Sequence, residues 1–204
     1  QTQIAPTDEL DAIDRQVERI NDLLQQLLTF SNPSPPEFQK ISIHVVIEDV
    51  LNVLKREFVE KNVEVIRDYH TGENELLKID QVQMRQAVYN VVINAVEAIS
   101  QKGSGTLTIS TEIKDASRSG RLKFDETVES YFELRIADTG VGIPAESLGS
   151  IFDPFYSLEK KKAGMGLSIT HRIIKDHGAF IYAESKLGEG ATFIVELPMT
   201  LKPA

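Results

Sequence analysis

The chain has 204 residues, of which 41% are hydrophobic and 26% charged, and its formal net charge is −9. This length is enough to bury one core and to carry a small appendage. The acidic balance argues against a nucleic-acid surface, which needs a basic footprint. No stretch has the apolar length of a membrane span, and the first residues do not predict a signal peptide. The absence of cysteine excludes disulfides and thiolate metal sites and fits a reducing compartment. Because the chain begins Gln-Thr-Gln, we expect it to be a fragment.

The first 30 residues predict an amphipathic helix with a coiled-coil seam. Apolar residues recur at alternating spacings of three and four, at Leu10, Ile13, Val17, Ile20, Leu24 and Leu27. Such a helix is expected to pack on a partner helix, because it is too short and apolar to be stable alone. A proline-rich connector over 32–36 follows, and we place a domain boundary there, between 1–36 and 37–204. The alternative is that the helix folds back onto the following domain.

The second unit mixes strands and helices without strict βαβ alternation. Periodicity predicts a long helix from Asp80, its expected N-cap, to about Gln101, and an exposed hairpin loop over 115–130. The other predicted elements are strands near 41–43, 63–69, 106–113, 131–137, 180–185 and 191–197, and helices over 46–62, 146–151 and 164–177. The predicted fold class is therefore α+β, a two-layer sandwich with one mostly antiparallel sheet covered by helices on one face, preceded by the N-terminal coiled-coil-type helix.

The stretch ADTGVGIP at the end of the 131–137 strand is the first candidate site. The strand runs directly into Asp138, and the glycines at 140 and 142 allow positive φ and close approach of a ligand to the backbone. A carboxylate fixed there can accept a hydrogen bond from an exocyclic amine such as that of adenine, while Ile143 offers an apolar wall to a flat ring. The alternative is an ordinary strand-to-helix turn in which Asp138 is a cap.

A polar stripe on the long predicted helix is the second candidate. Gln83, Gln86, Asn90, Asn94 and Glu97 are spaced three or four residues apart and share one face. Such a stripe is usually a solvated face, but two asparagines in mid-helix lower helix propensity. Their amide oxygens suit a hard cation that bridges phosphates.

Two glycine-containing segments complete the set. Lys160, Lys161 and Lys162 lead into Gly164 and Gly166 at the start of a helix, where backbone N–H groups and the helix dipole can face a phosphate. The alternative is a charged loop with a glycine-tolerant cap. The segment GEGATF over 188–193 is by itself typical of a hairpin turn.

The order of these motifs resembles one known family. NxxxN on a helix, then DTGVGIP, FDPFY, GMGL and GEGATF are similar to the ATP-binding domain of sensor histidine kinases, in the superfamily of DNA gyrase B, the heat-shock chaperone ATPase and the mismatch-repair ATPase. The resemblance covers about 38–198. The segment ERINDLLQQLLTFSNPSPPEF resembles the second helix of the dimerisation and phosphotransfer hairpin in nitrogen-regulation-like kinases.

The resemblance implies a role for each matching residue. Asp138 would receive the adenine amine, Asn94 would hold Mg²⁺ with Asn90 beside it, and residues 144–163 would form a mobile lid anchored by Phe152 and Phe155. The residues assigned to nucleotide binding are Asn90, Asn94, Asp138, Gly140, Gly142, Ile143, Phe155, Lys162, Gly164, Met165, Gly166, Leu167 and Thr192, with Asn90 and Asn94 also as catalytic residues and metal ligands.

The resemblance also implies the reaction and its partners. The hydrolytic relatives have a glutamate base where Asn90 stands, and an asparagine cannot take a proton from water. We therefore expect phosphoryl transfer from Mg-ATP to a histidine, relay to an aspartate of a response-regulator receiver domain, and slow hydrolysis. The expected setting is a cytoplasmic homodimer, with membrane anchoring of the intact protein left open.

The sequence departs from the family in several places, and one of them is Glu97 with Ala98, which replace the basic and aromatic residues found in many members. Ser157, Leu158 and Glu159 replace the usual lid residues, and Lys162 with Ala163 replaces the start of the glycine run. No histidine is followed by an acid, as the acceptor would be, so the chain is expected to bind ATP without phosphorylating itself. The rival hypotheses are a nucleotide-gated interaction module, such as an anti-sigma factor or pseudokinase, and an ATPase of the gyrase class, which Asn90 disfavours.

Overall fold

The structure is a computed structural model that describes residues 35–72, 75–115, 128–158 and 164–201. The predicted N-terminal helix and most of its connector lie outside the described residues. The elements in chain order are β1 (Gln39–Ser42), α2 (Ile43–Val53), α3 (Lys55–Glu60), β2 (Val63–Tyr69), β3 (Leu76–Ile79), α4 (Gln81–Ser100), β4 (Gly105–Asp115), β5 (Val128–Asp138), the 3₁₀ turn η2 (Ala145–Ser147), α5 (Gly166–Asp176), β6 (Phe180–Lys186) and β7 (Gly190–Leu201).

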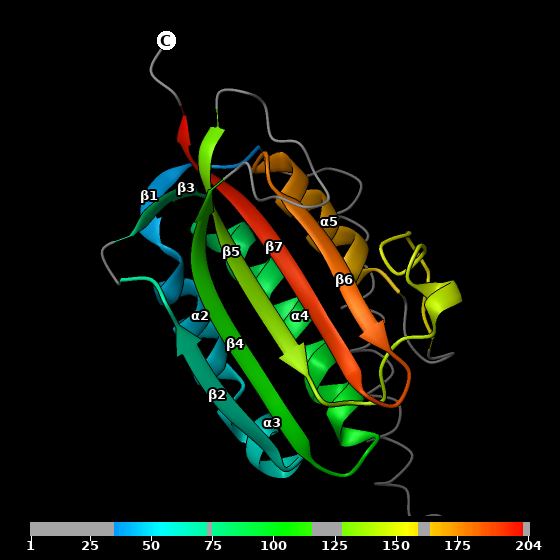
Figure 1. Cartoon of the computed structure of the whole chain (residues 1–204). Helices are drawn as coiled ribbons and strands as arrows, with labels where there is room; N and C mark the ends of the chain where they lie inside the picture. The colour runs from blue at the N-terminus through cyan, green and yellow to red at the C-terminus, as the bar shows by residue number, and fades with distance from the viewer. Residues whose placement is uncertain (1–34, 73–74, 116–127, 159–163, 202–204) are drawn as a thin grey trace, which may run out of the picture.

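A five-stranded sheet forms one layer, with the strand order β2-β4-β5-β7-β6. The pair β2–β4 is parallel and the three other pairs are antiparallel. Helices α2, α4 and α5 lie on one face of this sheet, as Figure 1 shows. A small antiparallel pair, β1 with β3, stands at one end. The predicted α+β two-layer sandwich is confirmed.

Helix α4 is the central element of the helical layer. Asp80 caps it as predicted, because its Oδ1 accepts hydrogen bonds from the N–H groups of Val82 and Gln83 at 2.9 and 3.0 Å. Its apolar residues recur at three- and four-residue spacings and are all buried against the sheet and α2, namely Met84, Ala87, Val88, Val91, Val92, Ala95, Val96 and Ile99. The polar stripe lies between this face and the solvent, since all five of its members are half-buried. It is therefore not a solvated face.

The structure differs from the sequence-based expectations in several elements, and one of them is the helix expected over 146–151, where only the 3₁₀ turn η2 forms. The helix expected over 46–62 begins at Ile43 and is split at Leu54 into α2 and α3. Strand β3 was not predicted, because its four residues alternate only twice between exposed and buried positions and show no clear period. The hairpin loop expected over 115–130 is shorter at both ends, since β4 reaches Asp115 and β5 begins at Val128.

Among the described residues, no helix is both long and apolar enough to cross a membrane.

Candidate functional site

Asp138 lies at the end of β5, at the lower end of the sheet in Figure 1. Its side chain is almost fully buried, and Oδ1 accepts the N–H of Gly140 at 2.7 Å. Thr139, the next residue, continues the pairing with β4, because its N–H donates to the Thr106 carbonyl at 3.1 Å and its Oγ1 accepts the Thr106 N–H at 2.9 Å. The carboxylate is therefore fixed in position by its own turn and by the neighbouring strand.

The electrostatics of Asp138 suit a ligand with N–H donors. Burial raises the pKa of this carboxyl, and the N–H groups of Gly140 and Ala191 and the charge of Lys102 offset only part of that rise. A buried carboxylate that has lost much of its water gains from each donor that it can accept. The exocyclic amine of a purine is such a donor.

The two glycines of the turn are required for different reasons. Gly142 has a φ of +73°, and a Cβ there would lie 2.3 Å from the Lys186 carbonyl oxygen. Gly140 does not have positive φ; a Cβ there would lie 2.5 Å from the carbonyl carbon of Ala98, at the end of α4. The packing of this turn excludes a side chain at both positions, but only Gly142 needs the left-handed conformation.

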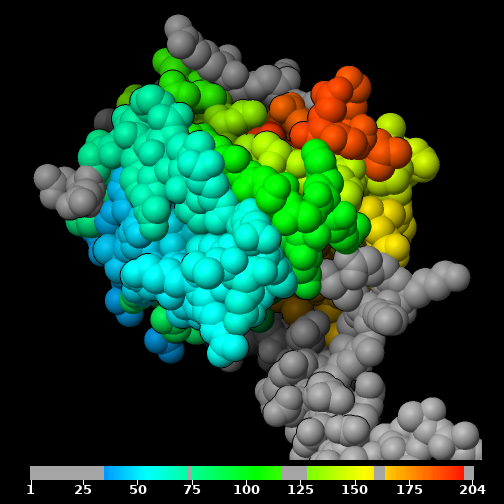
Figure 2. Space-filling view, turned by 90° about the horizontal axis from the view of Figure 1, so that it is seen from below, coloured from blue at the N-terminus to red at the C-terminus, as the bar shows by residue number. Residues whose placement is uncertain are grey.

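The loops beside Asp138 are connected by hydrogen bonds that the sequence did not reveal. The Nζ of Lys102 donates to the carbonyl oxygens of Thr139 at 2.7 Å and Gly188 at 3.1 Å. The N–H of Gly188 donates to the Val141 carbonyl at 2.7 Å. In Figure 2 the end of α4 (green), the β6–β7 turn (orange) and the segment after β5 (yellow) meet at this end of the molecule. A lysine in the run QKGSG has no motif around it, so nothing in the sequence signalled this role.

Ser185 makes a second connection that was missed. Its Oγ accepts the N–H of Ile143 at 2.8 Å and donates to the Gly190 carbonyl at 2.7 Å, which ties the turn after β5 to the β6–β7 hairpin. Thr192, a predicted site residue, lies on β7 opposite Ala137, next to the Asp138–Ala191 pair. The structure thus brings Asp138, Ile143 and Thr192 to one end of the sheet.

Helix α4 carries the asparagines in a fixed order away from Asp138. Ala98 accepts the N–H of Val141 at 3.2 Å and so lies beside the Asp138 turn. At a rise of about 1.5 Å per residue, Asn94 lies about 6 Å and Asn90 about 12 Å further along the helix axis. Both asparagines are half-buried. A ligand that begins at Asp138 and follows α4 therefore meets Asn94 and then Asn90.

The start of α5 lies next to Asn90. The Asn90 Nδ2 donates to the Gly166 carbonyl at 3.0 Å, so one of the two predicted metal ligands contacts the predicted phosphate segment. The first N–H groups of α5, at Gly166 and Leu167, are at the positive end of the helix dipole. Met165 is buried in the core, so only its backbone can face a ligand.

The segment between β5 and α5 contains the predicted lid. Phe152 is anchored as expected, because its ring packs 5.5 Å from that of His171 and 6.4 Å from that of Phe193. Phe155 is not an anchor; it is 64% exposed and has a φ of +65°. The expectation of two anchors was therefore wrong for Phe155, because the left-handed turn there directs the ring away from the core. Lys162 lies outside the described residues. Gly164 lies near the end of this segment and against Tyr156. A Cβ at residue 164 would lie 2.3 Å from the Tyr156 carbonyl oxygen, so a side chain would not fit there.

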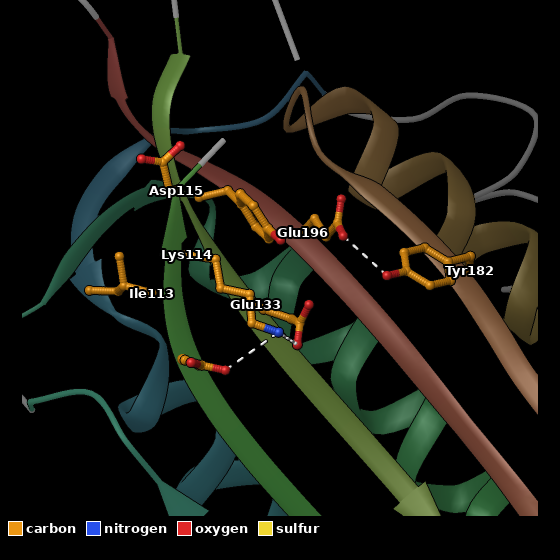
Figure 3. Close-up of a pocket in the computed structure, with 8 residues that line it drawn as sticks. Ile113, Lys114, Asp115, Glu133, Tyr182 and Glu196 are labelled. Carbon is orange, nitrogen blue, oxygen red and sulfur yellow. Dashed lines mark hydrogen bonds and ion pairs between the residues drawn. The ribbon is translucent and has the colours of Figure 1, made fainter. Parts of the chain in front are cut away.

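A hollow of about 330 Å³ lies on the sheet face opposite the helices. Figure 3 shows its lining, in which Lys114 contacts Glu133 at 2.6 Å and Tyr182 donates to Glu196 at 3.1 Å. Glu133 and Glu196 alternate with core residues along β5 and β7, so they point away from the helical layer. Glu133 is at the middle of β5 and pairs with Glu196 of β7, and the carboxylates of these two residues would repel phosphates.

The residues present fit a metal ion only in combination with a ligand. No group of three or more His, Cys, Asp or Glu side chains that could hold a metal ion occurs within the four described ranges. The amide oxygens of Asn90 and Asn94 are hard donors on one face of α4, which suits an ion that keeps most of its water and takes its remaining ligands from phosphates.

The chain matches a family model described as "Histidine kinase-, DNA gyrase B-, and HSP90-like ATPase" over residues 79–201. The sensor kinase CckA of Brucella abortus (strain 2308) is 33% identical over 193 residues, which cover 93% of this chain and 20% of that protein. The sensory histidine kinase/phosphatase NtrB of Rhizobium leguminosarum bv. phaseoli is 27% identical over 183 residues, covering 90% of this chain and 47% of that protein. The likeness to NtrB agrees with the predicted nitrogen-regulation-like resemblance. The chain spans a fifth to about half of the length of these relatives.

Solved structures show the same fold. Full-length ShkA in complex with AMPPNP superimposes with a TM-score of 0.77 at 19% identity, over 100% of this chain and 41% of that chain. The histidine kinase ThkA in complex with the response regulator protein TrrA gives a TM-score of 0.73 at 23% identity, over 98% of this chain and 53% of that chain. With the family match over more than half of its length, the chain belongs to the histidine kinase-, DNA gyrase B- and HSP90-like ATPases, and its ATP-binding domain is of the sensor histidine kinase type.

Proposed function

We propose that this domain binds ATP with Mg²⁺ and transfers the γ-phosphoryl group to a histidine on a helix of the dimerisation hairpin, from which it passes to an aspartate of a response-regulator receiver domain. The observation that carries the proposal is the order of groups along α4. The buried carboxylate of Asp138 lies at one end, followed by Asn94, then Asn90, and then the N-terminus of α5 in contact with Asn90.

Each part of a nucleotide has a matching part of this arrangement. Asp138 would accept the adenine amine, with Ile143 and Thr192 beside the ring. The triphosphate would then follow α4 toward the N–H groups of Gly166 and Leu167, which favour an anion. The distance of about 12 Å between the levels of Ala98 and Asn90 agrees with an extended nucleotide that spans the two ends.

The amide side chains would hold the metal ion at the phosphates. Mg²⁺ bound there supplies positive charge that offsets the charge of the triphosphate. Asn94 and Asn90 would orient it through their oxygens, and neither amide can remove a proton from water at neutral pH. The site is therefore suited to positioning the γ-phosphoryl group for a protein nucleophile. Neither of these two side chains can act as the base that would activate a water molecule.

The proposed partners follow from the relatives' names. The relatives are sensor kinases, and the ThkA structure contains a response regulator, which supports a receiver domain as the final acceptor. The amphipathic seam over 10–27 supports dimerisation of the intact protein through its N-terminal helix. Dependence on ATP and on a response regulator supports a cytoplasmic location for the domain.

Transfer of label from ATP tests the proposal. The chain is mixed with a separately produced helical hairpin that carries the acceptor histidine, with γ-labelled ATP and Mg²⁺. Acid-labile label on the hairpin, absent with Asp138→Ala and with Asn94→Ala, is the expected result. Tight ATP binding without transfer would instead support a nucleotide-gated interaction module. Rapid release of free phosphate by the chain alone would indicate a hydrolytic ATPase, and calorimetry that detects no binding of adenine nucleotides would refute the proposal.

A further inference from the structure

The side chain of Asn90 has one orientation, which its partners define. Its Nδ2 donates to the Gly166 carbonyl at 3.0 Å and contacts the Thr170 Oγ1 at 3.3 Å, so both partners lie in the first two turns of α5. A backbone carbonyl can only accept a hydrogen bond. The nitrogen of the Asn90 amide must therefore face α5. The flipped orientation of the amide, with its oxygen and nitrogen exchanged, would place two acceptors against each other and is excluded.

The oxygen of the same amide is left for a ligand. Within the described residues the Asn90 Oδ1 accepts no hydrogen bond, and the side chain is only half-buried. A Cβ on residue 166 would lie 3.8 Å from this oxygen, in ordinary contact, so the glycine leaves the space beside Oδ1 open. Asn90 therefore offers an acceptor, and not a donor, to the space beside Gly166 at the start of α5.

Thr170 is the second partner that holds this orientation. It is fully buried, and its Oγ1 donates to the Gly166 carbonyl at 3.0 Å. A hydroxyl has one proton and two lone pairs, so after this donation Oγ1 can only accept from Asn90. Threonine hydroxyls in helices often bond to the carbonyl four residues back, and that contact alone would be structural. Thr170 makes an additional contact with the Asn90 amide on α4, and a threonine with only a structural role in α5 would not need this contact.

We propose that Thr170 is a positioning residue that fixes the Asn90 amide with its oxygen toward the metal-bound phosphates, so that Asn90 serves as an oxygen ligand to the metal ion or to its bound water. This inference rests on the proposed function of the site. Without the Thr170 hydroxyl, the amide nitrogen keeps a single acceptor, and the amide can turn its N–H groups toward the phosphates instead. Loss of a partner that orients a metal ligand typically weakens metal affinity by about 10-fold or more.

The dependence of ATP affinity on Mg²⁺ is the measurement that isolates this role. ATP binding is measured by calorimetry with excess Mg²⁺ and with EDTA, for the unaltered chain, Thr170→Val, Thr170→Ser and Asn90→Ala. We expect Thr170→Val to lower the gain in affinity due to Mg²⁺ by about 10-fold while binding in EDTA is unchanged. Thr170→Ser keeps the hydroxyl and should retain the gain, and Asn90→Ala should lose it.

Thr111→Val is a matched control for the loss of a buried hydroxyl. Thr111 is also almost fully buried, and its Oγ1 makes two hydrogen bonds, to His44 at 3.1 Å and Thr71 at 2.8 Å. We expect this variant to lose thermal stability like Thr170→Val but to keep the full Mg²⁺ dependence. A merely structural role of Thr170 would make the two valine variants behave alike.

A second readout needs no nucleotide and no substitution. In the NMR spectrum of the nucleotide-free protein, the side-chain amide protons of Asn90 should exchange with water more slowly than those of Asn94, which makes no hydrogen bond within the described residues. Equal exchange rates would overturn the inference even if Thr170→Val does not fold. So would a Thr170→Val protein that keeps the parental Mg²⁺ dependence while Asn90→Ala loses it. A parent chain that binds no ATP would refute the proposed function instead.

Discussion

Gly190 is the position where a single methyl group should disturb the nucleotide site most. It begins β7 with a φ of +106°, and a Cβ there would lie 1.9 Å from the carbonyl oxygen of Asp138. Side-chain Cβ atoms do not approach non-bonded atoms closer than about 3.0 Å. Gly190→Ala therefore requires the backbones of Gly190 and Asp138 to separate by at least 1.1 Å, the difference between 3.0 and 1.9 Å. Both belong to paired strands, so the carboxylate of Asp138 must move with its backbone.

The size of the effect follows from this displacement. A shift of about 1 Å in a bound geometry costs on the order of 10²-fold, which corresponds to about 2.7 kcal/mol of ATP binding. The strain of an L-residue at this φ and the overpacking each add about 1–3 kcal/mol of destabilisation. Gly190→Ala should therefore lose about 2–6 kcal/mol of stability, and a domain that starts at about 5–15 kcal/mol can remain folded at 25 °C.

Gly188→Ala separates the clash from the backbone strain. Gly188 lies in the same turn with a φ of +85°, but nothing lies within 4 Å of a Cβ placed there. This variant should lose only the strain term, about 1–3 kcal/mol, and bind ATP like the parent. Calorimetric titration with ATP at 25 °C, with circular dichroism to confirm folding, gives both quantities. ATP binding that is equal in the two alanine variants would refute the argument that the Asp138–Gly190 contact fixes the site.

Three further predictions concern charged side chains. Because burial raises the pKa of Asp138, ionising this carboxyl costs stability as the pH rises through the range just above the ordinary value of about 3.9. The melting temperature of Asp138→Asn should therefore rise relative to that of the parent between pH 4 and 7, while the amide abolishes ATP binding. A melting temperature of the parent that rises relative to that of Asp138→Asn over this range would contradict the predicted sign. For Asp80, burial raises the pKa, but hydrogen bonds from the N–H groups of Gln83, Glu37 and Val82 outweigh it and leave the pKa lowered; the stability from this cap is present above about pH 4 and is lost as the pH falls further, so Asp80→Ala should cost about 1–2 kcal/mol at pH 7 in chemical denaturation and less below pH 4. Lys102→Met should weaken ATP binding several-fold at nearly constant melting temperature, because the exposed cation joins two carbonyl groups of different loops, and Lys102→Arg should restore binding. ATP binding by Lys102→Met that equals that of the parent would show that the two loops keep their positions without this cation.

The sequence predicted the fold best where one periodicity is long and uninterrupted. Helix α4 and its cap at Asp80 were predicted within a residue, because eight apolar residues repeat at helical spacing behind an N-cap aspartate. The split of α2 and α3 at Leu54 was not predictable, since apolar residues continue through it. Strand β3 was missed because its pairing with β1 is a long-range contact that leaves only four residues of local pattern.

The site was predictable to the extent that its residues carry unusual chemistry for their position. An acid at a strand end and two mid-helix asparagines contradict local propensity, so they were visible in the sequence. Lys102, Ser185 and Thr170 are ordinary residues for a loop, a strand end and a helix, and their roles arise only from contacts with segments tens of residues away. The exposed position of Phe155 was likewise hidden, because its left-handed φ is set by the surrounding turn.

The chain that enters this domain is attached to the same two helices that carry the candidate site. The N–H of Glu37 donates to Asp80 Oδ2 at 2.8 Å, and the ring of Phe38 packs edge-on against His177 at 5.2 Å. His177, the C-cap of α5, accepts the N–H of Asp80 at 2.9 Å and donates from Nδ1 to the Ile173 carbonyl at 2.7 Å. The start of α4 is thus joined to residue 37 by a partly buried hydrogen bond, the end of α5 is joined to residue 38 by a ring contact, and the buried Asp80–His177 hydrogen bond links the two helix ends, where such a bond is strong. A force that moves the entering chain therefore acts on both helices at once. The Asn90–Gly166 hydrogen bond joins the same two helices, so a movement of one helix relative to the other would change this contact.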